Sequence, residues 1–202
     1  GIAQPVEIDM LHPLPVDGDI SQYVLMNYKQ PFEYVKEGGD KGFHKKGEWA
    51  KAAYWIVQNS NLTAGEGGAA VDLAFKTKYG DGSDAGLALQ TDWGFDNPKN
   101  DGKVYQTSHL QKGKYKLTAH VYEYDRRGFT GYVAVCKGNE MANTSDIPSK
   151  SLANASISGT GDVVVDISVE EPTDVVIGFV CTITVKQGRA KIDNFKLELV
   201  EQ

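Results

Sequence analysis

Residues 114–125 read KYKLTAHVYEYD, and apolar and polar side chains alternate through this stretch. Side chains point to opposite faces of a β-strand with a period of two, so the alternation predicts a long strand. Leu117, Ala119 and Val121 would face a core. The residues expected on the opposite, displayed face are Lys116, Thr118, His120, Tyr122 and Tyr124.

Other stretches show similar patterns, each bounded by Gly, Pro, Asn or Asp. Strands are expected at residues 69–75, 87–93, 103–107, 131–136, 162–169, 174–185 and 191–200. Residues 49–58 fit a strand or a short helix, and their aromatic side chains favour the strand. Residues 139–154 show little periodicity, which is typical of a long surface loop with room for one helical turn.

Many strands without a long amphipathic helix indicate an all-β protein. A sandwich protects its sheets by packing them face to face, so we predict an antiparallel β-sandwich of the jelly-roll type. Residues 1–21 contain Pro5, Pro13 and Pro15 and are expected to form an extended lead-in or linker. Residues 22–202 are expected to form a single β-sandwich domain.

Composition argues against some partners. The chain has 202 residues and a formal net charge of -6, and its 21 basic residues are scattered. Nucleic-acid affinity comes mainly from clustered Lys and Arg, so no nucleic-acid partner is expected. No apolar run reaches the length of a membrane span.

Cys136 and Cys181 lie in apolar runs, which favours free thiols in the core.

The sequence shows no catalytic signature. It contains no Gly-x-Ser-x-Gly, and neither cysteine has an electropositive setting. The four histidines lack the spacing of a zinc site. Acidic residues are plentiful, but no pair stands out as the two carboxylates of a glycoside hydrolase. We therefore expect no enzymatic activity.

Several segments in order resemble a known fold family. They are GKYKL at 113–117, GYVAV at 131–135, DVVIGF at 174–179 and AKIDNFKL at 190–197, with PFEY at 31–34 in the front half. Together they resemble galactose-binding-domain-like jelly rolls, a group that includes many carbohydrate-binding modules. The resemblance covers the chain after about residue 22. It is greatest to the carbohydrate-binding-module-like domains of uncharacterised Bacteroidetes surface lipoproteins.

This resemblance implies a structural calcium ion between the first and last strands. The matching ligands would be Glu33 and Asp193, and carbonyl oxygens would have to complete the shell. Lys29-Gln30-Pro31 stands where the family tends to have Asn-Gly, which changes this loop. In the alternative, Asp193 accepts hydrogen bonds from backbone amides and Glu33 faces solvent. The sequence DGSD at 81–84 is a weaker calcium candidate and is more typical of a turn.

A glycan site needs rings that stack on a sugar and polar groups that hold its hydroxyls. The candidate rings are Trp93, Tyr122 and Tyr124, and the candidate hydrogen-bonding residues are Asp92, His120, Asp125, Arg126 and Arg127. The alternative is structural, because cross-strand aromatic pairs also stabilise a sheet by about 0.2 to 1 kcal/mol.

Taken together, these features predict a non-catalytic carbohydrate-binding module that binds a glycan on a sheet face or on rim loops. The resemblance implies export to the cell surface or periplasm, as an outer-membrane lipoprotein that meets the membrane only through a lipid anchor. The alternative is a structural or protein-binding adhesive module without a glycan ligand.

Overall fold

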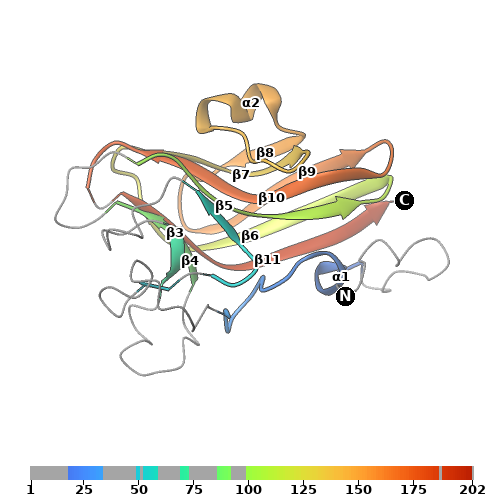
Figure 1. Cartoon of the computed structure of the whole chain (residues 1–202), viewed down its shortest axis with the longest axis horizontal. Coiled ribbons are helices and arrows are strands. Elements are labelled where there is room, and N and C mark those ends of the chain that lie inside the picture. Colours follow the sequence, from blue (N-terminus) through green and yellow to red (C-terminus); the bar gives the residue numbers. More distant parts are fainter. Residues whose placement is uncertain are drawn as a thin grey trace.

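The computed structural model describes two antiparallel sheets that pack face to face (Figure 1). The described residues are 18–33, 49–50, 52–58, 69–72, 86–91, 99–186 and 188–201. Within them, no helix is long and apolar enough to cross a membrane. Trp93, Asp92 and residues 81–84 lie outside the described residues.

The first sheet has the strand order β1-β3-β4-β11-β6-β9, and the second has the order β2-β5-β10-β7-β8. The strands of the first sheet are β1 (Trp49–Ala50), β3 (Ala69–Asp72), β4 (Gly86–Gln90), β11 (Arg189–Glu201), β6 (Gly113–Asp125) and β9 (Gly161–Val169). Those of the second are β2 (Ile56–Gln58), β5 (Lys99–Leu110), β10 (Thr173–Ile183), β7 (Phe129–Lys137) and β8 (Ala153–Ser156). The short helices described are α1 (Ser21–Val24), the 3-10 turn η3 (Thr144–Asp146) and α2 (Ile147–Lys150).

The strand pairing is that of a jelly roll. Strand β4 pairs with β11, β5 with β10, β6 with β9, and β7 with β8. These nested pairs alternate between the sheets, as they do when one long antiparallel hairpin is wrapped around a core. The pairing confirms the predicted all-β jelly-roll sandwich.

The core lies between the sheets and is built from alternate residues of the long strands. Leu117, Ala119 and Val121 of β6 are fully buried, as the alternation predicts. Phe195 of β11 contacts Phe179 of the second sheet, with ring centroids 6.5 Å apart. The central strand thus has the buried face that its sequence indicates.

A β-bulge in β6 changes which residues face outward. Val121 and Glu123 pair with the adjacent residues Ile192 and Lys191 of β11, so Tyr122 is the extra residue of the bulge. An extra residue reverses the faces of the residues that follow it. The displayed face therefore continues with Glu123 in place of Tyr124.

A second bulge follows directly on β11. Ile192 and Asn194 pair with Val121 and His120, so Asp193 is the extra residue. The two bulges lie side by side and together restore the register. They are the main irregularity of the central strand pair.

The prediction that Tyr122 and Tyr124 share one displayed face is therefore wrong. Tyr124 packs against the core, where it makes an edge contact with Phe129 at a centroid distance of 5.3 Å. Tyr122 is half-buried, and its ring lies where a Cβ atom of Gly86 would be. A side chain at this position of β4 would require the Tyr122 ring to move.

Residues 18–33 cover the edge of β11 where β4 has ended. The backbone N–H of Ile20 donates to Leu197 O (2.9 Å), and that of Phe195 donates to Tyr28 O (2.8 Å). Lys29 forms an isolated bridge to Asn194. Residues 18–21, predicted to belong to the lead-in, are therefore part of the folded body.

Within 49–58 the structure describes two short strands, β1 and β2, which belong to different sheets and are separated by a turn at residues 53–54. The strand character expected there is present at both ends, but one continuous strand is not formed. Residues 139–154 are more than the expected surface loop. Met141 and Ile147 of this segment are buried and pack against the outer face of the second sheet. Lys103 holds the segment there, because its Nζ donates to Met141 O and Asn143 Oδ1, both at 2.8 Å.

Both cysteines are buried thiols outside any disulfide, as expected. Cys136 belongs to the small outer cluster under α2, whereas Cys181 belongs to the main core. They lie on opposite faces of the second sheet, so they cannot pair without disrupting it.

At Gly178 of β10 the backbone of the paired strand β5 leaves no space for a side chain. A Cβ atom there would overlap the carbonyl oxygen of Val104 on the paired strand. We expect Gly178→Ala to lower the free energy of unfolding by about 1 to 3 kcal/mol, because neither backbone can move aside. Urea denaturation measures this change. Gly159→Ala is the matched control, since no atom of the described residues lies within 4 Å of the Cβ position there; an equal loss in both variants would contradict the packing described.

Candidate functional site

A line of polar residues crosses the outer face of the six-stranded sheet. His120 on β6 lies opposite Asp162 on β9 and opposite Asn194 on β11, and Asn194 lies opposite Lys29. Residues directly opposite on neighbouring strands share a face, and strands lie about 4.8 Å apart, so the line is roughly 14 Å long. We call Asp162, His120, Asn194 and Lys29 the polar row.

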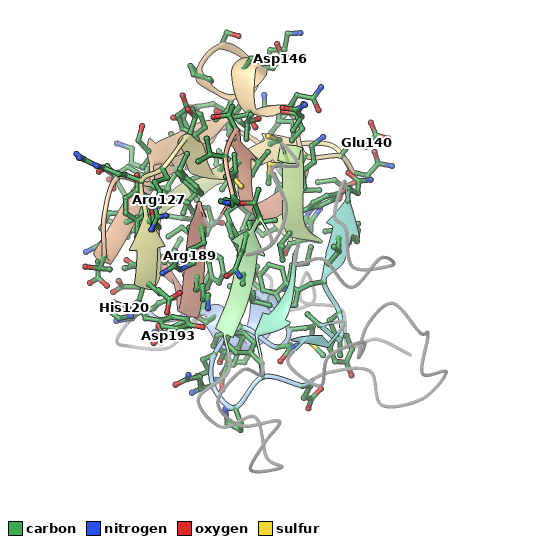
Figure 2. The ribbon with its side chains drawn as sticks, turned by 90° about the vertical axis from the view of Figure 1, so that its left-hand side faces the viewer. His120, Arg127, Glu140, Asp146, Arg189 and Asp193 are labelled. Atoms are coloured by element: carbon green, nitrogen blue, oxygen red, sulfur yellow. The ribbon has the colours of Figure 1, made fainter. Side chains whose placement is uncertain are left out.

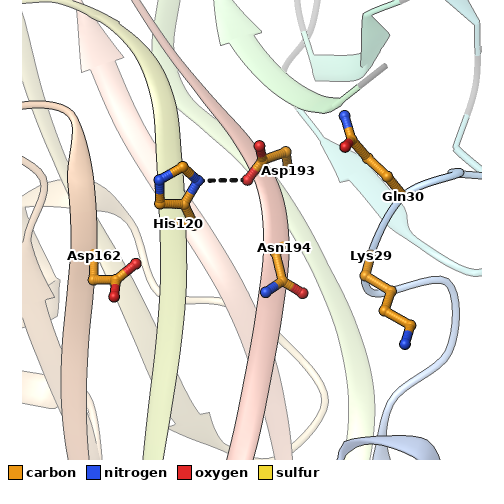
Figure 3. Close-up of a pocket in the computed structure, with 6 residues that line it drawn as sticks. All are labelled: Lys29, Gln30, His120, Asp162, Asp193 and Asn194. Atoms are coloured by element: carbon orange, nitrogen blue, oxygen red, sulfur yellow. Dashed lines mark hydrogen bonds and ion pairs between the residues drawn. The ribbon is translucent and has the colours of Figure 1, made fainter. Parts of the chain in front are cut away.

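The polar row lines an open hollow of about 460 Å³ (Figure 3). Gln30 and Asp193 complete its lining. Strands β9, β6 and β11 supply one side, and the edge segment that carries Lys29 and Gln30 supplies the other. The jelly roll therefore joins residues from distant parts of the chain in one site.

His120 has a fixed orientation in the hollow. Its Nδ1 lies 2.7 Å from Oδ1 of Asp193, the bulged residue of β11 (Figure 3). The His120 side chain is 44% exposed and that of Asp193 is 22% exposed. A partner at Nδ1 determines how the ring is turned, and it directs Nε2 away from Asp193. Nε2 can therefore meet a ligand.

The lining residues offer complementary hydrogen-bonding groups. The carboxylate of Asp162 accepts, the Lys29 ammonium group donates, and the amides of Asn194 and Gln30 do both. Asp162 and Asn194 are exposed to solvent. The hollow can thus bind a ligand with several hydroxyl groups along its length.

The two predicted calcium ligands, Asp193 and Glu33, lie in different settings. Asp193 is paired with the His120 imidazole, whereas calcium requires several oxygen ligands. Glu33 is exposed, and its backbone N–H donates to Asn27 Oδ1 at 2.7 Å. Among the described residues, no group of three or more His, Cys, Asp or Glu could hold a metal ion. The calcium site remains a prediction.

A second polar cluster lies further along the same strands (Figure 2). Glu123 Oε2 is 2.5 Å from Arg189 Nε and 3.0 Å from Lys191 Nζ. Burial alone would raise the pKa of Glu123, but hydrogen bonds and charges from Lys191 and Arg189 outweigh it and lower the pKa. The bulge at Tyr122 makes this cluster possible because it brings Glu123 opposite Lys191.

Asp125 and Arg127 belong to this second cluster rather than to the hollow. Arg127 pairs with Asp125 Oδ2 at 2.8 Å, and Arg189 reaches the same oxygen at 3.5 Å. Burial raises the pKa of Asp125, but hydrogen bonds from Arg127 and the charges of Arg127 and Arg189 give a net lowering. Arg126 is exposed in the turn after β6.

The structure thus divides the predicted site residues. It brings His120 and Asp193 together and places Asp125 and Arg127 in an ion-pair cluster further along. The hollow is also lined by Lys29, Gln30, Asp162 and Asn194, which are not among the ligand residues predicted from sequence. Asn194 could have been found, because it lies in the segment 190–197 that carries the family resemblance. Asp162 could not, since only the β6–β9 register reveals it.

The fold and the hollow define a jelly-roll domain with a polar site on one sheet face. The chain belongs to the family described as domain of unknown function DUF5013, which matches residues 26–178. No curated protein matches the chain.

Solved structures similar to the chain include carbohydrate-binding modules. The module TmCBM61, solved in complex with β-1,4-galactotriose, is 13% identical with a TM-score of 0.47, and the match covers 83% of this chain and 98% of that one. A putative sugar-binding protein from Bacteroides thetaiotaomicron is 13% identical with a TM-score of 0.39, over 87% and 100% of the two chains. An adhesin domain of Lys-gingipain from Porphyromonas gingivalis is 14% identical with a TM-score of 0.39, over 73% and 92%.

The lowered pKa of Glu123 makes stability depend on pH. The ionised carboxylate stabilises the fold above the ordinary glutamate pKa of 4.5, and this contribution is lost as pH falls through the lower pKa of the folded protein. We expect Glu123→Gln to flatten the dependence of Tm on pH between about pH 5 and pH 3. Thermal unfolding over this range measures it. Glu170→Gln, an exposed control, should keep the wild-type slope; identical slopes in all three proteins would contradict the role of Glu123.

Proposed function

We propose that this protein is a non-catalytic glycan-binding module that holds its ligand in the hollow on the outer face of the six-stranded sheet. The observation that carries the proposal is the register of the polar row. Asp162, His120, Asn194 and Lys29 lie opposite one another on four neighbouring segments. They present acceptors and donors in a line.

This arrangement suits a sugar chain. Each ring presents several hydroxyl groups that both donate and accept hydrogen bonds, and the acceptors and donors of the polar row complement them. The open hollow would leave part of the glycan in solvent, as is expected for binding to a long or surface-attached polymer. Tyr122 supplies an apolar ring nearby. Its ring lies over Gly86, and the next residue of β4, Leu87, pairs with Ile192, which directly precedes the bulged Asp193.

The setting of the carboxylates supports binding over hydrolysis. A glycoside hydrolase needs a carboxylic acid in an apolar setting that keeps it protonated, with a second carboxylate across the bond. Asp162 is exposed, and Asp193 is engaged by His120. Neither is enclosed in the way that such an acid requires.

The location of the protein is also part of the proposal. We propose that it is exported and acts at the cell surface or in the periplasm, tethered as an outer-membrane lipoprotein. The support for this is the resemblance to domains of Bacteroidetes surface lipoproteins. A surface array of such modules would strengthen weak individual binding through multivalency.

The test is a glycan array followed by calorimetry on wild type, His120→Ala and His109→Ala. His109 is a matched control, because its Nδ1 also lies 2.7 Å from an aspartate oxygen, that of Asp174, but on the other sheet. We expect His120→Ala to weaken binding about fivefold or more, the loss of about one ligand hydrogen bond. His109→Ala should bind as wild type does.

Two results would contradict the proposal. If the folded wild type bound no glycan at millimolar concentration, the alternative of a structural or protein-binding module would replace it. If reducing ends appeared on incubation with a bound glycan, the module would be an enzyme. Circular dichroism of each variant confirms that the comparison is made between folded proteins.

A further inference from the structure

Val164 is an exposed apolar residue on the outer face of β9. The neighbouring Val163 and Val165 are buried in the core, whereas the outward-facing Val164 is 42% exposed. The other outward-facing residues of this strand are polar and exposed: Asp162, Asp166 and Ser168. A β-branched residue favours a strand wherever it lies, so exposure alone assigns Val164 no role. Its position relative to the hollow does.

The strand register places Val164 beside the polar row. Strands β6 and β9 pair without a register shift, and Thr118 lies opposite Val164 just as His120 lies opposite Asp162. The two pairs are consecutive on the same outer face of the sheet, because residues two apart on a strand share a face. They are separated by about 7 Å along the strands. Val164 and Thr118 therefore border the hollow.

His120 directs a ligand toward this border. Asp193 engages Nδ1 of the imidazole from the β11 side, and Figure 3 shows the other ring nitrogen, Nε2, on the side of β9 and Asp162. A sugar that bonds to Nε2 and to the carboxylate of Asp162 lies over β6 and β9. One side of that sugar then reaches the row of Val164 and Thr118.

The apolar surface at this border is small. We call the side chain of Val164 and the methyl group of Thr118 the methyl patch. Lys196 lies opposite Thr118 on β11, and its Nζ is 3.7 Å from Oε2 of Glu198, which lies further from the hollow. The next row across the sheet is charged and consists of Glu198, Lys116 and Asp166. The methyl patch is thus one row wide, far smaller than the surface a protein partner needs.

The chemistry of the methyl patch fits a methyl group better than a whole sugar ring. The flat C–H face of a pyranose packs best on an aromatic ring, which offers a broad apolar surface. The methyl patch offers only the methyl groups of two β-branched side chains. A single methyl substituent of a sugar can be covered by them, while the polar row bonds to the hydroxyl groups of the same sugar.

We propose that the methyl patch selects sugars that carry a methyl group, either C6 of a 6-deoxyhexose or the methyl of an N-acetyl group. This inference rests on the proposed function and names the class of sugar that the hollow takes. Hydroxyl groups of the sugar bond to His120 Nε2 and to Asp162, and its methyl group packs against Val164 and Thr118. The corresponding sugar without the methyl group binds more weakly.

The test uses pairs of sugars that differ only in the group that bears the methyl. The pairs are D-fucose with D-galactose, L-rhamnose with L-mannose, and N-acetylglucosamine with glucose, each as the terminal sugar on the array and as the free sugar in calorimetry. We expect the wild type to prefer the methyl-bearing member of at least one pair by about fourfold or more, the value of burying one methyl group. The pair that shows the preference distinguishes the 6-deoxy from the N-acetyl source.

Two variants test the residues of the methyl patch. Val164→Thr exchanges a methyl group for a hydroxyl and keeps the β-branched shape, and Thr118→Ser removes the methyl group and keeps the hydroxyl. Each should reduce the preference to about twofold or less, with the affinity for the methyl-free sugar unchanged. Val200→Thr is the matched control, because Val200 is a 64% exposed valine near the far end of β11. It should keep the wild-type preference.

The outcomes separate this inference from the proposed function. The preference is a ratio of two affinities within one variant, so it does not depend on the fraction of folded protein. If the wild type bound glycans without such a methyl group as tightly as those with one, the inference would be overturned and the proposed function would stand. A preference that persisted in both patch variants would also overturn it, because the methyl group would then be recognised elsewhere. Absence of glycan binding by the wild type would overturn the proposed function itself.

Discussion

The paired bulges at Tyr122 and Asp193 are the constraint on which the site depends. Tyr122 is an extra residue on β6, and Asp193 is an extra residue at the neighbouring position of β11. The two shifts cancel, so β6 and β11 pair in the same register on both sides of the bulges. The bulge on β11 lets Asp193 reach His120. The bulge on β6 turns Glu123 outward toward Lys191 and Arg189. One local irregularity therefore organises both polar clusters of the outer sheet face.

The jelly roll supplies the rest of the site through strand order. Asp162, His120 and Asn194 come from distant parts of the chain, and the order β11-β6-β9 brings them into one line. The short strand β4 leaves the remainder of β11 open, and residues 18–33 fill that edge. Lys29 reaches Asn194 only because of this replacement.

The buried face of the fold was predictable from sequence, whereas the displayed face was only partly so. Leu117, Ala119 and Val121 follow the period of a strand, and burial enforces that period. Beyond Val121 the alternation predicts the wrong face, because the bulge at Tyr122 adds a residue that a period-two pattern does not reveal. Tyr124 therefore faces the core. His120 and Asp193 were each selected for different reasons, yet their contact depends on register.

The central claim is that a glycan binds over His120. The most direct measurement is a nuclear magnetic resonance titration that follows the imidazole signals of His120 and His109 as a glycan is added. The two rings have equivalent aspartate partners on opposite sheets, so each serves as the reference for the other. The account predicts saturable shifts of the His120 signals with the His109 signals unchanged. A glycan that binds while the His120 signals stay unchanged would contradict it.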